Sequence, residues 1–373
     1  MKNVIGLVNF HTAPEVLPIT ASRPLGSTSY LGRYAFCDFA LSNLCNSGIS
    51  QVGLLVKDHQ RSILKHLGNM SSWVINTKIG HQRILYNEPA HRDPRLNTDL
   101  NNLVENDWLL YDSSAEYLLF VPSHLVVSMD LRPYLKNHVA ENRAITLVAS
   151  KQRNVKSAFL GSKVLEFDAQ GTLVDANTNA GQYPGPASVY LDTLIVNRHL
   201  LIELIQKYKP TNPLLDIFSL LLMGYKDGVA PIAVEYFDGF VRSPDSFHHY
   251  MDYSLEMLDK HKADQLFNPQ WPIYTLTHDT PPALYGVDAE VSNSYVSNGA
   301  RVQGKVFNSI IARNVIVGKG AIVKNSIIFS SVKINDGAVV ENALIDKYAI
   351  IEREHTIKGK AKDPLYVAQG AIL

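Results

Sequence analysis

Two histidines and three arginines of this sequence are candidates for binding a ligand. His11 follows a short apolar segment, Val4–Val8, and His124 ends the stretch EYLLFVPSH (116–124). Histidine exchanges protons near neutral pH, and the arginine guanidinium binds phosphate and carboxylate groups through paired hydrogen bonds. Such groups could form a cationic cluster around an anion; the full set is His11, Arg23, Arg33, His124 and Arg242.

The turn that follows Val4–Val8 lacks the residues that hold a nucleotide. In sheet enzymes that bind nucleotides, glycines in this turn let backbone N–H groups close around the phosphates. Here the turn carries Phe10, His11, Ala13 and Glu15, and it contains no glycine. We therefore expect that this turn cannot form a phosphate cradle.

Strands and helices alternate up to about residue 260, and they must position these side chains. Short apolar segments predict strands, and apolar residues spaced three and four apart predict helices. The alternation predicts a mostly parallel sheet covered on both faces, with ligand sites at the carboxyl ends of strands, here Asn9–Glu15 and Pro122–His124. The predicted strands are 4–8, 52–56, 116–124 and 144–150, and the predicted helices are 41–47, 59–67, 200–208 and 213–225.

The last part of the sequence repeats itself. The motifs NSYV, NSII, NSII and NALI begin at positions 293, 308, 325 and 342, and apolar residues recur every six positions, as in Ile311, Val317 and Val323. Three faces of about six residues make one triangular coil, and stacked coils bury one apolar residue per face. The period therefore predicts a parallel β-helix of the hexapeptide type.

A proline-rich stretch, NPQWPIYTLTHDTPPALYG (268–286), separates these two patterns. Proline fixes the backbone and removes a hydrogen-bond donor, so we expect this stretch to run extended over a surface. We divide the chain into an α/β domain (1–260), a linker (261–286) and a β-helix (287–373). We interpret the β-helix as a scaffold for assembly; the alternative is an acyltransferase site, for which His355 is the only histidine available there.

Composition and charge exclude several classes of partner. The chain has 373 residues, of which 46% are apolar and 19% charged, and 35 basic residues balance 35 acidic ones. No net field favours nucleic acid or an anionic membrane, no apolar run is long enough to span a bilayer, and no leader precedes the first strand. We therefore expect a cytoplasmic protein. Cys37 and Cys45 are predicted to be buried thiols without metal-ligand spacing.

The stretch YLGRYAFCDFALSNLCNSGISQVGLLVKDHQRSILKHL (30–67) resembles the ADP-glucose pyrophosphorylase (glucose-1-phosphate adenylyltransferase) family. The stretch LFNPQWPIYTLTHDTPPALYG (266–286) resembles the linker of that family, and the repeats follow where the family has its β-helix. The resemblance implies a Rossmann-like, mixed-sheet nucleotidyltransferase domain followed by a left-handed parallel β-helix. It also implies a reaction in glycogen biosynthesis, in which ATP and glucose 1-phosphate give ADP-glucose and pyrophosphate.

The positions that carry chemistry in that family are changed here. Phe10, His11 and Ala13 stand at the glycines of the family's first loop, and Glu15 stands at its phosphate-binding arginine. Leu25 replaces a lysine.

The positions of the family's two metal-binding aspartates are also changed: they carry Ser123 and Ser243, beside a retained His124 and a retained Arg242. Asp192 stands at a glycine of the family motif. Because a Mg²⁺ clamp supplies several kcal/mol and each ~1.4 kcal/mol is tenfold in rate, the combined losses suggest a rate lower by roughly 10⁴ or more.

This pattern resembles the GlgD-type subunit, which accompanies a catalytic paralogue and shares the sequence Arg-Pro-Leu found here at 23–25. The resemblance implies a regulatory, catalytically impaired chain in a hetero-oligomer, which we expect to be a tetramer. We expect no cofactor on this chain, with Mg²⁺ and ATP used by the catalytic partner, and we also consider a homo-oligomer.

Two other hypotheses remain open at this point. In the first, the chain is an active adenylyltransferase whose metal is held by Asp130 or Asp245, although both also fit helix starts. In the second, the chain is a binding module whose old pocket senses a sugar phosphate or nucleotide. The candidate binding residues for that pocket are Phe10, His11, Ala13, Arg23, Arg33, His124, Asp192 and Arg242.

Overall fold

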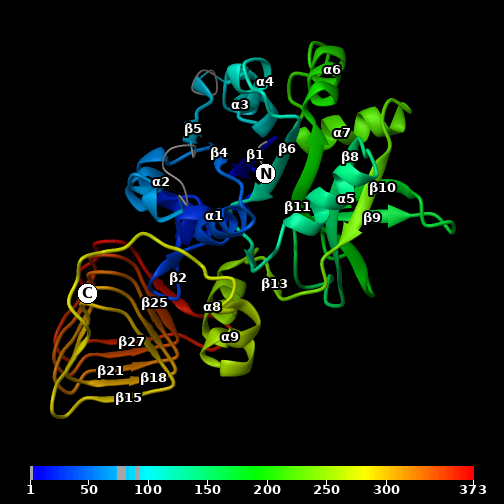
Figure 1. Cartoon of the computed structure of the whole chain (residues 1–373). Coiled ribbons are helices and arrows are strands. Elements are labelled where there is room, and N and C mark those ends of the chain that lie inside the picture. The colour runs from blue at the N-terminus through cyan, green and yellow to red at the C-terminus, as the bar shows by residue number, and fades with distance from the viewer. Residues whose placement is uncertain (1–2, 74–80, 89–92) are drawn as a thin grey trace.

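Two kinds of β-structure divide the chain in the computed structural model, which describes residues 3–73, 81–88 and 93–373 (Figure 1). As far as helix α9, strands and helices alternate around one mixed sheet. From strand β14 onward the strands are short and stack into three parallel sheets. The predicted fold class, an α/β domain followed by a hexapeptide-type β-helix, is therefore confirmed.

The first strand lies in the middle of the mixed sheet. β1 (Val4–Asn9) pairs in parallel with β4 (Gln51–Leu55) on one side and β6 (Tyr117–Pro122) on the other. β11 (Ala187–Asn197) runs antiparallel to β6, so the sheet is mixed, whereas strand–helix alternation alone predicted a mostly parallel one. The other strands of this sheet are β5 (His81–Leu85), β8 (Ile145–Gln152), β9 (Lys163–Phe167), β10 (Leu173–Thr178) and β12 (Ile232–Tyr236).

Helices cover both faces of this sheet because successive side chains of a strand point to opposite faces. Val4 and Val8 of β1 belong to an apolar cluster with α1, α2 and α5, whereas Ile5 and Leu7 belong to a second cluster with α3, α4, α6 and α7. No helix in the described ranges is long and apolar enough to cross a membrane. The helices are α1 (Cys37–Asn46), α2 (Gln60–Leu67), α3 (Asp99–Glu105), α4 (Trp108–Tyr111), α5 (Arg132–Ala140), α6 (Arg198–Tyr208), α7 (Ile217–Lys226), α8 (Phe247–Leu255) and α9 (Lys260–Leu266).

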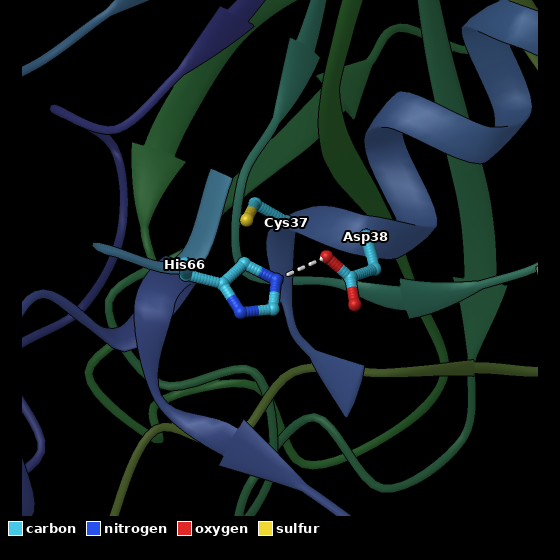
Figure 2. Close-up of side chains that lie close together, drawn as sticks. All are labelled: Cys37, Asp38 and His66. Atoms are coloured by element: carbon cyan, nitrogen blue, oxygen red, sulfur yellow. Dashed lines mark hydrogen bonds and ion pairs between the residues drawn. The ribbon is translucent and has the colours of Figure 1, made fainter. Parts of the chain in front are cut away.

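A partly buried hydrogen bond joins the first two helices. Asp38, in the first turn of α1, lies 2.6 Å from Nε2 of His66 in the last turn of α2 (Figure 2). Cys37 and Cys45 are both buried free thiols, as the sequence predicts. Four short strands pair in two small ribbons beside the main sheet: β2 (Ser29–Tyr30) with β3 (Tyr34–Ala35), and β7 (Val126–Val127) with β13 (Val241–Arg242).

The asparagines of the repeat explain why the β-helix has its period. Asn293, Asn308, Asn325 and Asn342 all adopt positive φ at a corner of the coil, a conformation that asparagine tolerates better than most residues. Their side chains bond from coil to coil at 2.8–3.2 Å. The three sheets contain β14 (Leu284–Tyr285), β17 (Arg301–Val302), β20 (Ile316–Val317), β23 (Lys333–Ile334) and β26 (Ile350–Ile351); β15 (Glu290–Ser292), β18 (Lys305–Phe307), β21 (Ile322–Lys324), β24 (Val339–Glu341) and β27 (Thr356–Lys358); and β16 (Tyr295–Val296), β19 (Ile310–Ile311), β22 (Ile327–Ile328), β25 (Ala343–Ile345) and β28 (Leu365–Val367).

The α/β domain and the β-helix share one apolar core. Val16, Ile19 and Leu25, which follow β1, are buried in the same cluster as Ile327 and Leu344 of the β-helix. Helix α9 occupies the first residues of the stretch 261–286, and no regular helix or strand lies between 267 and 283, a range that is described throughout. The joint between the two domains is therefore a packed interface.

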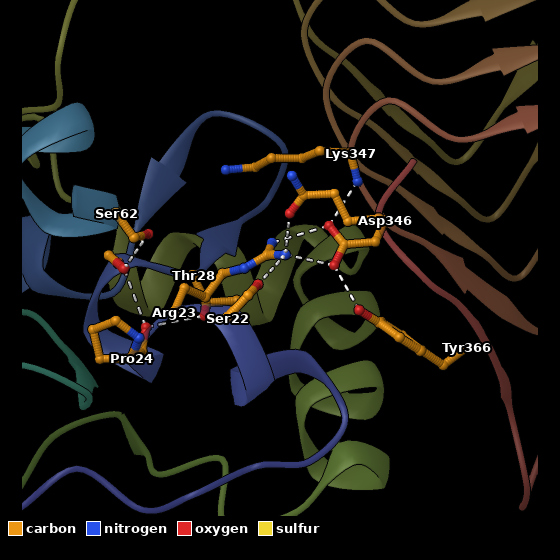
Figure 3. Close-up of polar contacts among 10 residues, drawn as sticks. Ser22, Arg23, Pro24, Thr28, Ser62, Asp346, Lys347 and Tyr366 are labelled. Carbon is orange, nitrogen blue, oxygen red and sulfur yellow. Dashed lines mark hydrogen bonds and ion pairs between the residues drawn. The ribbon is translucent and has the colours of Figure 1, made fainter. Parts of the chain in front are cut away.

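Arg23 crosses this interface and pairs with Asp346 of the β-helix (Figure 3). Two parallel bonds of 3.0 and 2.6 Å join the guanidinium to the carboxylate, and the Tyr366 hydroxyl donates a further bond of 2.6 Å to Asp346. Both charged side chains are almost completely buried, at 3% and 0% exposure. Removing one partner of such a pair leaves an uncompensated buried charge.

We predict that Arg23→Ala lowers the free energy of unfolding by about 3–5 kcal/mol, because Asp346 then remains buried without its cation. Urea denaturation followed by circular dichroism measures the loss. Arg132→Ala is the matched control, because its pair with Asp130 is exposed, and it should leave the free energy of unfolding nearly unchanged. The double variant Arg23→Met with Asp346→Leu should recover most of the loss; equal destabilisation by Arg23→Ala and Arg132→Ala would contradict the assignment.

Candidate functional site

A cavity of about 330 Å³ lies at the carboxyl ends of β1 and β6, where the sequence predicts a ligand site. His11 follows β1, His124 follows β6, Asp192 lies in β11 and Ser243 follows β13. The complete lining is His11, Thr12, Pro14, Asn97, Thr98, Asp99, His124, Leu160, Gly161, Ser162, Lys163, Asp192, Asp216, Phe218 and Ser243.

Three backbone N–H groups of the turn after β1 are hydrogen-bonded within the protein. The Phe10 amide bonds to the carbonyl of Leu55 at 3.0 Å, and the His11 amide bonds to the side-chain oxygen of Asn9 at 2.9 Å. The Val16 amide donates to the Thr20 hydroxyl at 2.9 Å. These three N–H groups are therefore already paired and cannot close around a phosphate.

The Phe10 side chain occupies the space beneath this turn. Phe10 is 1% exposed and belongs to the core beside β1. Gly26 passes so close that a Cβ placed on it would lie 2.6 Å from the Phe10 ring and 2.8 Å from the Ser123 hydroxyl oxygen. Phe10 and Ser123 thus line the inside of the packed turn, while Leu25 is buried in the core shared with the β-helix.

The three arginines of the candidate set do not meet in this cavity, so the expected cationic cluster does not form. Arg23 pairs with Asp346 of the β-helix, and Arg242 pairs with Glu256 at 2.7 Å. Arg33 is exposed and lies over the Tyr34 ring at 5.8 Å. Two further turn residues, Ala13 and Glu15, do not line the cavity among the described residues either; Ala13 packs on the shared core and Glu15 is exposed.

The two carboxylates considered as replacement metal ligands are engaged elsewhere. Asp130 pairs with Arg132 at 2.6 Å on the surface. Asp245 accepts a bond of 2.7 Å from the Leu160 amide and pairs with His249, while Ser246 caps the following helix. Neither aspartate lines the cavity in the described part of the chain.

Both histidines of the cavity are neutral at physiological pH. Burial lowers the pKa of His11 to about 4 and that of His124 to about 3. Nδ1 of His11 lies 3.2 Å from the Asn97 carbonyl oxygen, and Nε2 lies 3.1 Å from the Asn102 side-chain nitrogen. The neutral ring can therefore donate to Asn97 and accept from Asn102. His124 lies 3.9 Å from Asp192, and its Nδ1 has no hydrogen-bond partner among the described residues. The two rings do not bond to each other.

Three carboxyl groups, Asp99, Asp192 and Asp216, give the cavity an acidic character. Burial and the neighbouring Asp99 and Asp216 raise the pKa of Asp192 to about 7. Burial and Asp216 raise the pKa of Asp99 to about 6, even though Asp99 accepts bonds from Asn9 and from two backbone amides. Lys163 is the single lysine or arginine among the lining residues of the described chain. Phosphate groups would therefore meet few positive charges here.

Sequence reasoning missed the residues that make this cavity acidic. Asp99 begins α3 and Asp216 caps α7, where it accepts a bond of 2.6 Å from the Ser219 amide. An N-cap aspartate can be recognised from sequence, but its place beside β1 depends on how the helices pack. Asp192 was singled out, and it stands at positive φ where β11 is irregular between Tyr190 and Thr193.

Comparisons with known proteins agree with this architecture. A nucleotidyl transferase family model matches residues 14–172, and a model of the GlmU-like C-terminal hexapeptide matches residues 283–363. The glycogen biosynthesis protein GlgD of Bacillus subtilis is 28% identical over 100% of this chain and 97% of its own length. GlgD of Geobacillus stearothermophilus is 28% identical over 86% of this chain and 83% of its own length. The glucose-1-phosphate adenylyltransferase of Thermotoga maritima is 27% identical over 79% of this chain and 69% of its own.

We predict that Asp192→Asn makes the free energy of unfolding less sensitive to rising pH. The folded chain keeps the Asp192 proton up to about pH 7, whereas the unfolded chain releases it near pH 4, so wild-type stability falls as pH rises through this window. Between pH 5 and pH 8 the variant should gain about 1–3 kcal/mol relative to wild type in urea denaturation. Asp238→Asn, at an exposed carboxylate, is the control and should show no such gain. Parallel stability curves for wild type and Asp192→Asn would contradict the prediction.

Proposed function

Because this chain belongs to the ADP-glucose pyrophosphorylase family, we propose that it is a regulatory, catalytically impaired subunit of glucose-1-phosphate adenylyltransferase in glycogen biosynthesis. Its partner would be a catalytic paralogue of the same family, with which it forms a hetero-oligomer. Its relatives include both a glycogen biosynthesis protein and a glucose-1-phosphate adenylyltransferase. Geometry and charge at the cavity favour the first role over the second.

The observation that carries the proposal is the packing of the turn after β1. Adenylyl transfer needs donors and cations around a triphosphate, positioned before the reaction begins. In this chain the Phe10, His11 and Val16 amides of the turn are paired, the Phe10 ring is buried beneath them, and three carboxyl groups line the cavity. The site therefore lacks the cluster of donors and cations that the reaction requires.

The residues at this site also do not fit a Mg²⁺ ion bound together with ATP. Ser123 and Ser243 stand where the family motif has its two metal-binding aspartates, and neutral hydroxyls hold Mg²⁺ far less well than carboxylates. Asp99, Asp192 and Asp216 do line the cavity, but they do not converge as a set of metal ligands. In the described part of the chain, the one group of three metal-ligating side chains within 4.8 Å of one another lies away from this cavity, at Cys37, Asp38 and His66. We therefore assign Mg²⁺ and ATP to the catalytic partner.

The open end of the β-helix offers a surface for that partner. Strands β14, β15 and β16 form the first coil, and in the described chain each pairs with a neighbouring strand on one side only. Leu284, Tyr285 and Val287 are exposed apolar residues of this coil. A subunit that binds here more tightly to the active arrangement of its partner would raise the population of that arrangement.

We predict that the purified chain forms ADP-glucose from ATP, glucose 1-phosphate and Mg²⁺ at least about 10⁴-fold more slowly than its catalytic paralogue. Mixing the two chains should raise the rate per catalytic subunit, because the catalytic chain is then held in its active arrangement. A coupled pyrophosphate assay measures both rates. The proposal fails if this chain alone turns over at the rate of an ordinary family enzyme, or if mixing leaves the paralogue unchanged.

Two sets of variants separate docking from ligand binding. His124→Gln changes a side chain of the cavity and should leave the stimulation of the catalytic paralogue intact. Tyr285→Asp combined with Val287→Asp places two charges on the exposed coil and should abolish both the stimulation and co-elution of the two chains on size exclusion. Loss of stimulation in His124→Gln with co-elution preserved would instead indicate that the cavity transmits a ligand signal.

A further inference from the structure

Cys37, Asp38 and His66 bring three different metal-ligating atoms together in the interior of the α/β domain (Figure 2). The thiol sulfur, a carboxylate oxygen and a ring nitrogen all lie within 4.8 Å of one another. Cys37 and Asp38 begin α1, and His66 lies in the last turn of α2. Two adjacent residues at the start of a helix can bind the same metal ion when a second helix supplies the third ligand.

The carboxylate of this cluster is already fixed in place. Asp38 is completely buried; one of its oxygens accepts the Ala35 amide at 3.0 Å and the other faces Nε2 of His66 at 2.6 Å. A metal ligand is normally oriented by a bond of this kind on its outer side. The Asp38–Ala35 bond would remain when the second oxygen turns to a metal ion.

The donor set is one that favours zinc. Zn²⁺ takes sulfur, nitrogen and oxygen ligands in tetrahedral geometry, whereas Mg²⁺ and Ca²⁺ prefer oxygen alone. Three protein ligands leave a fourth position for water. His66 is 15% exposed and, with Ala35, lines a cavity of about 220 Å³, so one ligand of the cluster is reached from that cavity.

We propose that Cys37, Asp38 and His66 form a binding site for one zinc ion that ties the start of α1 to the end of α2. Binding replaces the thiol proton of Cys37 with the metal, and that proton passes to solvent. His66 ligates through Nε2, so its ring proton resides on Nδ1. The site lies next to the domain interface, since the neighbouring Lys65 donates a bond of 3.1 Å to the Tyr348 hydroxyl of the β-helix. The site is independent of the regulatory role proposed above.

The test uses the full chain, purified without a metal-binding tag and kept reduced. After removal of metal with a chelator, the chain is equilibrated with buffered Zn²⁺, and bound zinc is counted by elemental analysis. We expect one zinc per chain and a higher melting temperature than the metal-free chain, since the ion binds the folded state. Co²⁺ in place of zinc should give the near-ultraviolet absorption of a cobalt–thiolate bond, together with the visible bands of tetrahedral cobalt.

Matched cysteine variants assign the ligand. Cys37→Ser should lose the cobalt–thiolate absorption and bind zinc at least about tenfold more weakly, whereas Cys45→Ser, at the other buried thiol, should retain both. His66→Gln can still donate a bond to Asp38, so it should fold and yet bind zinc more weakly. The proposal is overturned if the wild-type chain binds only substoichiometric zinc, if its cobalt complex lacks the thiolate band, or if Cys37→Ser binds zinc as tightly as wild type.

Discussion

The segment between β1 and Ser27 is packed from both sides, and the rest of the structure depends on this constraint. Phe10 enters the core beneath the sheet, while Val16, Ile19 and Leu25 enter the core shared with the β-helix. Arg23 then places a buried positive charge on Asp346 of the other domain. A segment so constrained connects two domains and cannot also open to receive a phosphate chain.

Periodicity predicted the β-helix and part of the α/β domain. The six-residue repeat fixed the β-helix, because only a coil with three faces buries one apolar residue at each interval. Apolar spacing placed α6 within two residues of its observed start. It placed the start of α7 too early, since Asp216 caps that helix after Pro213. Strand β11 was not predicted, because the irregularity at Asp192 interrupts its apolar alternation. Its antiparallel direction depends on partners that are distant in sequence.

Less of the candidate site could be predicted, and the reason is the range of the interactions that form it. The strand ends were identifiable, and His11 and His124 do line one cavity there. The partners of the arginines could not be identified from sequence, because the carboxylate that pairs with Arg23 lies 323 positions further along the chain. The Cys37–Asp38–His66 cluster was also hidden: the sequence shows two cysteines without metal-ligand spacing, and packing of α2 on α1 supplies the third donor.

The same packing explains why restoring a few family residues would not restore chemistry. Replacing Phe10 by glycine would remove a buried aromatic side chain from the core, a change that commonly costs about 3–5 kcal/mol when the cavity cannot collapse. Carboxyl groups would still line the cavity, because Asp99 and Asp216 accept backbone hydrogen bonds at the starts of α3 and α7. They cannot leave the cavity without loosening those helices. The features that exclude a triphosphate are thus the ones that hold the domain together.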